Sequence, residues 1–82
     1  MRLLERIKDL ENNYIFLRWA TGCEYGKIIN VGEDFVEFQI VDVETMEFKE
    51  TAIINHQLIL ELMYGGADVA RIIAEISSKI HE

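Results

Sequence analysis

The sequence predicts a mainly β domain, a small, strongly bent antiparallel barrel of five strands with a helix at each end. The alternation of side chains between residues 33 and 43 is the first observation, since Val36, Phe38 and Ile40 share one side of a strand. Turn residues separate this segment from similar apolar runs on both sides. Apolar residues recur at helical spacing near both ends of the chain. The 82 residues have room for one domain, residues 1–82.

The first helix is predicted over about residues 2–12, where charged residues lie largely off an apolar face. That face is formed by Leu3, Leu4, Ile7 and Leu10. Asn12-Asn13 ends the helix, because Asn favours local side-chain bonding and turns. The same charges interrupt any apolar run, so we expect no signal peptide.

The barrel is predicted over about residues 14–64. Its strands are expected at residues 14–20, 24–31, 33–43, 46–55 and 57–64. Gly26 lies inside the second strand, where a glycine marks a sharp bend or a close backbone approach. A bent strand lets a small sheet close on itself. Asn55-His56 leaves only a very short connection between the last two strands.

The last helix is predicted over about residues 68–81, with Asp68 at its cap or in its first turn. One apolar stripe contains Val69, Ile72, Ile73, Ile76 and Ile80. Burying each of these side chains is worth about 1.5–3 kcal/mol, so the stripe must find a surface. The barrel or a neighbouring subunit is the expected surface, with another protein as the alternative.

Size and composition predict self-association. A chain this short buries only about 60–65% of its unfolded surface and usually needs a disulfide, a metal or oligomerisation. Cys23 is the single cysteine and no Cys/His cluster is present, so self-association is the remaining way to stabilise the fold. We expect the fifth strand to pair with the fourth strand of a neighbouring copy. The interface is predicted at Phe48, Leu58, Leu60 and Leu62.

The charge balance limits the partners. The net charge of −7 argues against generic DNA or RNA binding, which relies on Lys and Arg neutralising phosphates, and against an anionic membrane surface. No segment approaches the roughly 18 apolar residues of a membrane span. The single cysteine suits a reducing compartment, and we expect a cytoplasmic protein.

Catalytic patterns are missing. There is no Ser near a His, no His-Glu-x-x-His and no Cys pair, and Gly65-Gly66 lacks the Lys and Ser/Thr of a P-loop. The carboxylates around residues 42–50 are interpreted as solvated charge, with a divalent cation as the alternative. We therefore expect no enzyme and no cofactor or metal.

A helix followed by five bent strands, with Gly26 in the second and a short fourth-to-fifth connection, resembles the Sm/LSm family, including its bacterial Hfq branch. The likeness covers roughly residues 3–63. The first family motif is matched by Gly26, Ile28, Val31, Phe35 and Val36, with Glu37 where the family has Asn. The second is matched by the Ile53–Ile59 segment, with Asn55 in place of a basic residue before His56.

The resemblance implies a strongly bent, Sm-like (SH3-type) barrel that forms a homo-oligomeric ring of about five to seven subunits. It further implies that the ring binds single-stranded RNA at an inner rim lined by Phe35, Glu37, Asn55 and His56. The alternative is an Sm-like or SH3-like scaffold that binds protein and never meets nucleic acid. The acidic charge favours this alternative, while the motif positions favour RNA.

Several side chains have a structural interpretation beside a functional one. His56 is either a base or phosphate contact or a turn residue, and Phe35 is either a stacking face or part of the core. Trp19 is expected in the core or at a subunit interface, and Cys23 is expected to fill apolar space.

Overall fold

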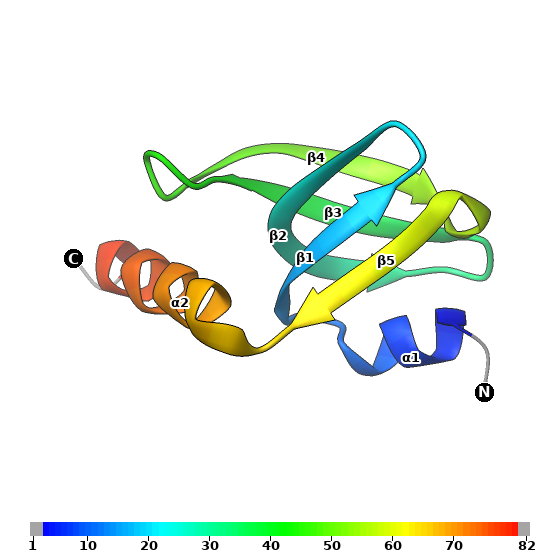
Figure 1. The fold of residues 1–82 in the computed structure, drawn as a ribbon, viewed down its shortest axis with the longest axis horizontal. Coiled ribbons are helices and arrows are strands. Elements are labelled where there is room, and N and C mark those ends of the chain that lie inside the picture. The colour runs from blue at the N-terminus through cyan, green and yellow to red at the C-terminus, as the bar shows by residue number, and fades with distance from the viewer. Residues whose placement is uncertain (1–2, 81–82) are drawn as a thin grey trace.

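The computed structural model describes residues 3–80, without the side chains of residues 79 and 80, and has five strands and two α-helices. Figure 1 shows α1 and α2 at opposite ends of one curved sheet. The elements in chain order are α1 (Leu3–Asp9), β1 (Tyr14–Trp19), β2 (Gly22–Val31), β3 (Phe35–Asp42), β4 (Glu47–Asn55), the short 3-10 helix η1 (His56–Leu58), β5 (Ile59–Tyr64) and α2 (Gly66–Ile80). The mainly β prediction and the antiparallel order of the strands are confirmed.

The five strands form one sheet in the order β4-β3-β2-β1-β5. Every neighbouring pair is antiparallel, and β5 returns to lie beside β1. Within the described residues, β4 therefore pairs only with β3 and β5 only with β1. The two strands that follow one another through η1 form the two edges of the sheet, and Figure 1 shows them at separate margins.

The main core draws buried side chains from all five strands and from α1. Val36, Phe38 and Ile40 are buried there, as the alternation in the sequence predicts. Ile7 of α1 is fully buried against the same core, so α1 covers one end of it. The main-chain N–H of Val31 donates to the Glu11 carboxylate at 2.8 Å, which fastens the turn after α1 to the end of β2.

Gly26 is a point of close approach in the middle of the sheet. It lies opposite Ile15 of β1 and Ile40 of β3. A Cβ at this position would overlap the carbonyl oxygen of Gln39 and come within 2.8 Å of the Phe38 ring. The glycine predicted inside β2 is therefore required there, because backbone and ring atoms leave no space for a side chain.

A second, smaller core lies where α2 packs. Val41 and Met46, beside the β3–β4 turn, are buried with Ile72 and Ile76 of α2. Tyr14 and Tyr25 pack against this cluster from the neighbouring strands. The apolar stripe of the last helix thus covers its own sheet, which was one of the surfaces expected for it. Ile73 is 42% exposed, and the side chain of Ile80 is outside the described part.

The boundaries differ from the predicted ones for physical reasons. α1 ends at Asp9, and the chain continues in turns to Asn12, which adopts a positive φ of 69°. The connection between β4 and β5 is a turn of 3-10 helix, because His56–Leu58 must lead the chain from one edge of the sheet to the other. Cys23 is exposed, so the expectation that it fills apolar space is wrong.

Candidate functional site

The four predicted rim residues gather where the β2–β3 turn meets the end of β4. Phe35 is the first residue of β3 and lies directly opposite Asn55, the last residue of β4. Glu37 pairs with Ile53, one step along the same side of the two strands. The main-chain N–H of His56 donates to the carbonyl oxygen of Asp34 at 3.0 Å. Residues about twenty positions apart in the sequence are thus brought together by strand register.

The Phe35 ring is held against the turn that precedes it. Gly32 donates its main-chain N–H to the carbonyl oxygen of Phe35 at 2.9 Å, which closes the turn. A Cβ on Gly32 would overlap three atoms of the Phe35 ring. The ring therefore lies across the glycine and is half-buried.

Asn55 and His56 form the turn that leads into η1. The Asn55 side-chain oxygen accepts the main-chain N–H of Gln57 at 2.9 Å, so Asn55 caps η1. Its amide NH2 keeps its two donors for a ligand, because Asn55 is exposed. His56 is half-buried, and among the described residues its Nδ1 atom is buried without a hydrogen-bond partner. The main-chain bond of His56 fits the turn interpretation, and both interpretations of its side chain stay predictions.

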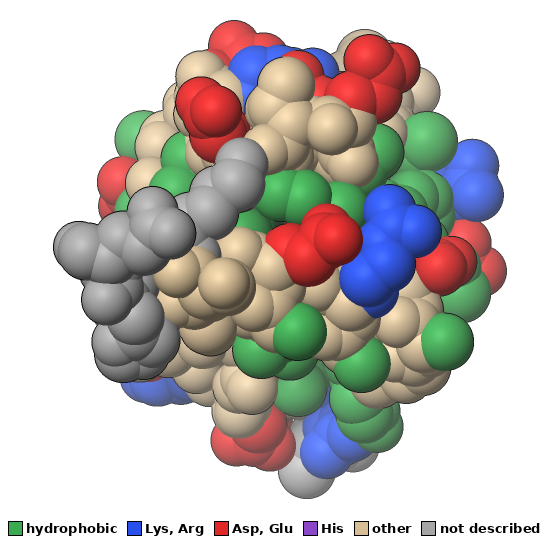
Figure 2. All heavy atoms as spheres, turned by 90° about the vertical axis from the view of Figure 1, so that its left-hand side faces the viewer, with side chains coloured by type: hydrophobic (Ala, Val, Ile, Leu, Met, Phe, Trp, Pro, Cys, Tyr) green, Lys and Arg blue, Asp and Glu red, His purple; other side chains and the backbone are tan. Residues whose placement is uncertain are grey.

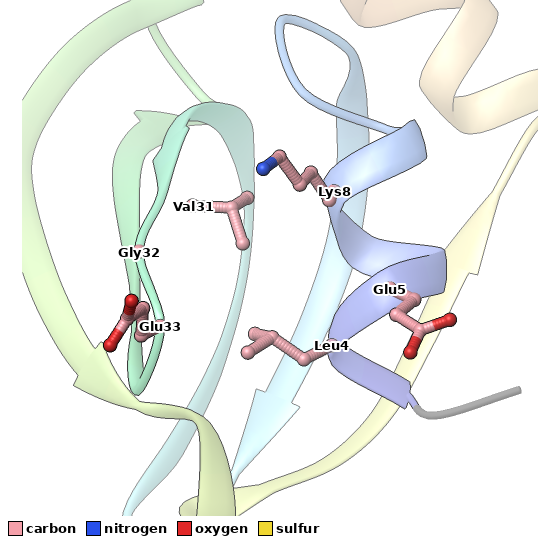
Figure 3. A pocket seen from close by; sticks show the side chains of 6 residues that line it. All are labelled: Leu4, Glu5, Lys8, Val31, Gly32 and Glu33. Atoms are coloured by element: carbon pink, nitrogen blue, oxygen red, sulfur yellow. The ribbon is translucent and has the colours of Figure 1, made fainter.

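The charges near this turn are mixed. Glu33, Asp34 and Glu37 place three carboxylates within the same short segment. Beside it, an open groove of about 300 Å³ lies between α1 and the β2–β3 turn, and Lys8 and Leu4 line its helical side. Figure 3 shows both side chains reaching from α1 toward Val31. Lys8 is a basic group that the motif comparison did not select, since it lies on the first helix.

The two sheet edges are the second notable feature. Three of the predicted interface residues, Phe48, Leu58 and Leu60, are exposed, whereas Leu62 is half-buried and packs against the main core. The most exposed apolar side chains are Ile53 on β4 and Leu60 on β5, at 70% and 66%. Ile53 was not selected from the sequence, because alternation alone does not distinguish an edge strand from a central one.

Other chemistry is sparse in the described part of the chain. No group of three or more His, Cys, Asp or Glu side chains in residues 3–78 is arranged to hold a metal ion. Asp42, one of the clustered carboxylates, accepts the main-chain N–H of Glu44 at 2.9 Å and so stabilises its own hairpin turn. Trp19 is half-buried and meets Phe38 edge to face at 6.3 Å, which matches its expected core position. No helix in residues 3–80 is long and apolar enough to cross a membrane.

The fold and site define a small, mainly β domain with one antiparallel five-stranded sheet, two helices and two uncovered edge strands. Comparison of the chain with protein-family models, with curated proteins and with solved structures finds no match.

Proposed function

We propose that the protein is a non-enzymatic, Sm-like subunit that assembles into a homo-oligomeric ring, with single-stranded RNA held at the inner rim. In this proposal β5 of each copy pairs with β4 of the next, because the two uncovered edges lie on different sides of one molecule. A head-to-tail contact of this kind closes into a ring when the rotation between copies permits, here with about five to seven members. The observation that carries the proposal is this pair of unpaired strand edges, each with exposed apolar side chains among polar ones.

The edges favour another copy of the chain as their partner. An uncovered edge strand carries main-chain N–H and C=O groups that readily pair with another strand. Ile53 on β4 and Leu60 on β5 add large exposed apolar side chains to the two edge strands. Lys49 is engaged with Glu24 at 3.6 Å and Arg18 with Glu61 at 3.1 Å, so part of the charge beside the edges is already neutralised.

The rim supports contacts to bases better than contacts to phosphates. Phe35 offers a ring face of the kind on which single-stranded bases stack, worth about 1–3 kcal/mol per base. Asn55 offers amide donors from an exposed position, and His56 follows it with a half-buried ring. Lys8, which shares the groove next to the same turn with Glu5 and Glu33, is the group we assign to a phosphate.

A second candidate function follows from the carboxylates of Glu33, Asp34 and Glu37 and from the net charge of −7. Carboxylates next to the rim repel phosphates, and an acidic protein surface does not attract nucleic acid. In this alternative the ring is a scaffold for protein partners, and the rim residues serve only the turn.

Fluorescence anisotropy with labelled U-rich and A-rich oligonucleotides separates the two candidates. RNA binding at the rim predicts saturable binding at about 50 mM salt that weakens at about 200 mM. Phe35→Ala removes the stacking face and His56→Ala removes the neighbouring ring, so both should weaken binding. Lys8→Ala should reduce the salt dependence of binding. The distant Ser78→Ala variant serves as the control. Absence of binding at the lower salt concentration leaves the scaffold as the function.

Assembly is tested by light scattering on a matched pair of variants. Leu60→Lys places a charge on the β5 edge and should lower the particle mass. Leu3→Lys makes the same change at an exposed residue of α1, outside both edge strands, and should leave the mass as it is. An unchanged mass for Leu60→Lys would contradict the strand interface.

A further inference from the structure

One flank of α2 is left uncovered by the packing of that helix. Val69, Ile72 and Ile76 are buried, and Ile73 and Ala70 lie to one side of this stripe, because successive helical residues are about 100° apart. Both residues border a groove of about 300 Å³ between α2 and the end of β5. Its other lining residues include Leu10, Tyr14 and Tyr64. The groove is therefore mostly apolar and open to solvent.

The position of a neighbouring copy follows from the direction of its strands. When β5 pairs antiparallel with β4 of the next copy, the last residues of β5 lie beside the first residues of that β4. The end of β5 is Tyr64, and β4 begins at Glu47. α2 starts at Gly66, directly after β5, so its first turns come next to the β3–β4 turn of the neighbour.

The neighbour carries exposed apolar side chains at that place. Val43 and Phe48, on either side of the β3–β4 turn, are 41% and 39% exposed. Phe48 stacks beside Tyr14 at 6.4 Å between ring centroids, and Tyr14 also lines the groove along α2. Phe48 thus lies on the face of the sheet that carries α2. When the sheet continues from one copy into the next, Phe48 remains on the face that carries α2. Figure 2, which views this end of the molecule, shows hydrophobic side chains exposed among charged ones.

We propose that the groove formed by Ala70, Ile73 and Tyr64 receives Phe48 and Val43 of the next copy, as a second contact zone between ring subunits. This inference rests on the strand pairing proposed above and adds a role for α2. The occupant is a second copy of this chain, because the exposed aromatic and aliphatic side chains that fit an apolar groove lie where antiparallel pairing brings them.

The area of contact supports a second zone. β5 has six residues and spans about 20 Å, and a sheet layer is about 10 Å thick. The strand edges alone thus cover roughly 200 Å² per partner, whereas stable interfaces bury about 800 Å² per partner. Contacts beyond the strands are required for a ring that persists on dilution. α2 follows β5 immediately and is the element best placed to supply them.

Two substitutions of the same kind on α2 test the proposal. Ala70→Glu puts a carboxylate into the groove, and Ala74→Glu puts one at an exposed residue one turn further along that does not line it. Sedimentation over a range of concentrations should show Ala70→Glu dissociating at a concentration at least about tenfold higher than the parent, with Ala74→Glu unchanged. Circular dichroism checks that α2 remains folded in both variants.

The outcomes separate this inference from the ring itself. An oligomer that is weakened equally by both variants, or by neither, overturns the α2 contact and leaves the strand pairing standing. A parent protein that sediments at 9.5 kDa at every concentration overturns both.

Cross-linking gives a second measurement that does not depend on stability. In a Cys23→Ser background, Phe48→Cys and Ile73→Cys are prepared as separate proteins, each with a single thiol, and then mixed. Mild oxidation should produce a disulfide-linked dimer of the two different chains, because the thiols meet across the subunit boundary. Replacing Ile73→Cys by Ala74→Cys is the control. Equal yields with both partners contradict the proposed contact.

Discussion

At the scale of single residues, the pairing of Gly32 with Phe35 determines how the candidate rim is presented. The ring occupies the space that a side chain on Gly32 would need, and the turn is closed by the Gly32 N–H. Gly32 is outside the left-handed region of φ, so its importance is one of space rather than of backbone conformation. The position of the Phe35 ring therefore depends on a glycine three residues earlier.

Gly32→Ala should lower the free energy of unfolding by about 1–3 kcal/mol, because the new Cβ forces the Phe35 ring from its place. In a Phe35→Ala background the same change should cost less than about 0.5 kcal/mol, since the overlap is gone. Urea denaturation of the four proteins at one concentration measures both costs. Gly22→Ala, whose Cβ would meet Trp19 at 3.3 Å, is the mild control. Equal costs in both backgrounds contradict the packing.

A titrating residue joins α2 to the sheet. The Tyr25 hydroxyl donates to the Asp68 carboxylate at 3.4 Å, and burial, followed by the charge and hydrogen bond of Asp68, raises the pKa of Tyr25 above 10.0. Burial also raises the pKa of Tyr14. As the pH rises, the unfolded chain loses these protons before the folded chain does. The contribution of the two tyrosines to the free energy of unfolding is therefore fully present below pH 10.0 and is lost as the pH passes through the folded pKa values.

Tyr25→Phe should therefore make the urea midpoint depend less on pH between about pH 9 and pH 11, while Tyr14 keeps part of the dependence. Ser77→Ala, at an exposed residue of α2 that does not line the pocket shared by Tyr25 and Asp68, should leave the slope as it is in the parent. A slope that Tyr25→Phe does not change would show that its hydroxyl takes no part in stability at high pH.

At the scale of elements, α2 is attached through few side chains. Ile72→Ala should reduce the free energy of unfolding by about 2–4 kcal/mol, because Ile72 is almost fully buried against Val41 and Met46. Arg71→Ala removes only an exposed pair with Glu75 at 3.9 Å and should cost less than about 0.5 kcal/mol. Chemical denaturation measures the difference. Similar costs for the two variants would mean that α2 is not packed as described.

The elements that the sequence predicts well are those in which each residue has one environment. β3 alternates between a core face and a less buried face, and the apolar stripe of α2 meets a core. The misplaced boundaries lie where tertiary contacts decide. η1 exists because the chain crosses between two sheet edges, and the register shift between Ile40 and Val41 brings Val41 into the second core. Alternation along one strand contains no information about either feature.

The candidate site was predictable in part. Strand register brings Phe35, Glu37, Asn55 and His56 together, as the family resemblance implied for the rim, and their function stays a prediction. Lys8 was not selected, because its place beside the turn depends on how α1 packs across the end of the sheet. The capping role of the Asn55 side chain likewise depends on η1.

At the scale of the whole molecule, a chain of 82 residues exposes two strand edges on different sides, with large apolar side chains on each. Small domains gain little margin from their own core, so covering these edges is the most direct source of further stability. The proposed ring, its rim and the proposed contact of α2 with the next copy all depend on the same association.

Sedimentation equilibrium, combined with hydrogen exchange on the same sample, tests this association most directly. The account predicts a mass several times 9.5 kDa, with the outward-facing main-chain amides of β4 and β5, those not bonded to β3 or β1, protected at high protein concentration and exposed on dilution. A mass of 9.5 kDa over the whole range, with β5 protected throughout, would contradict it.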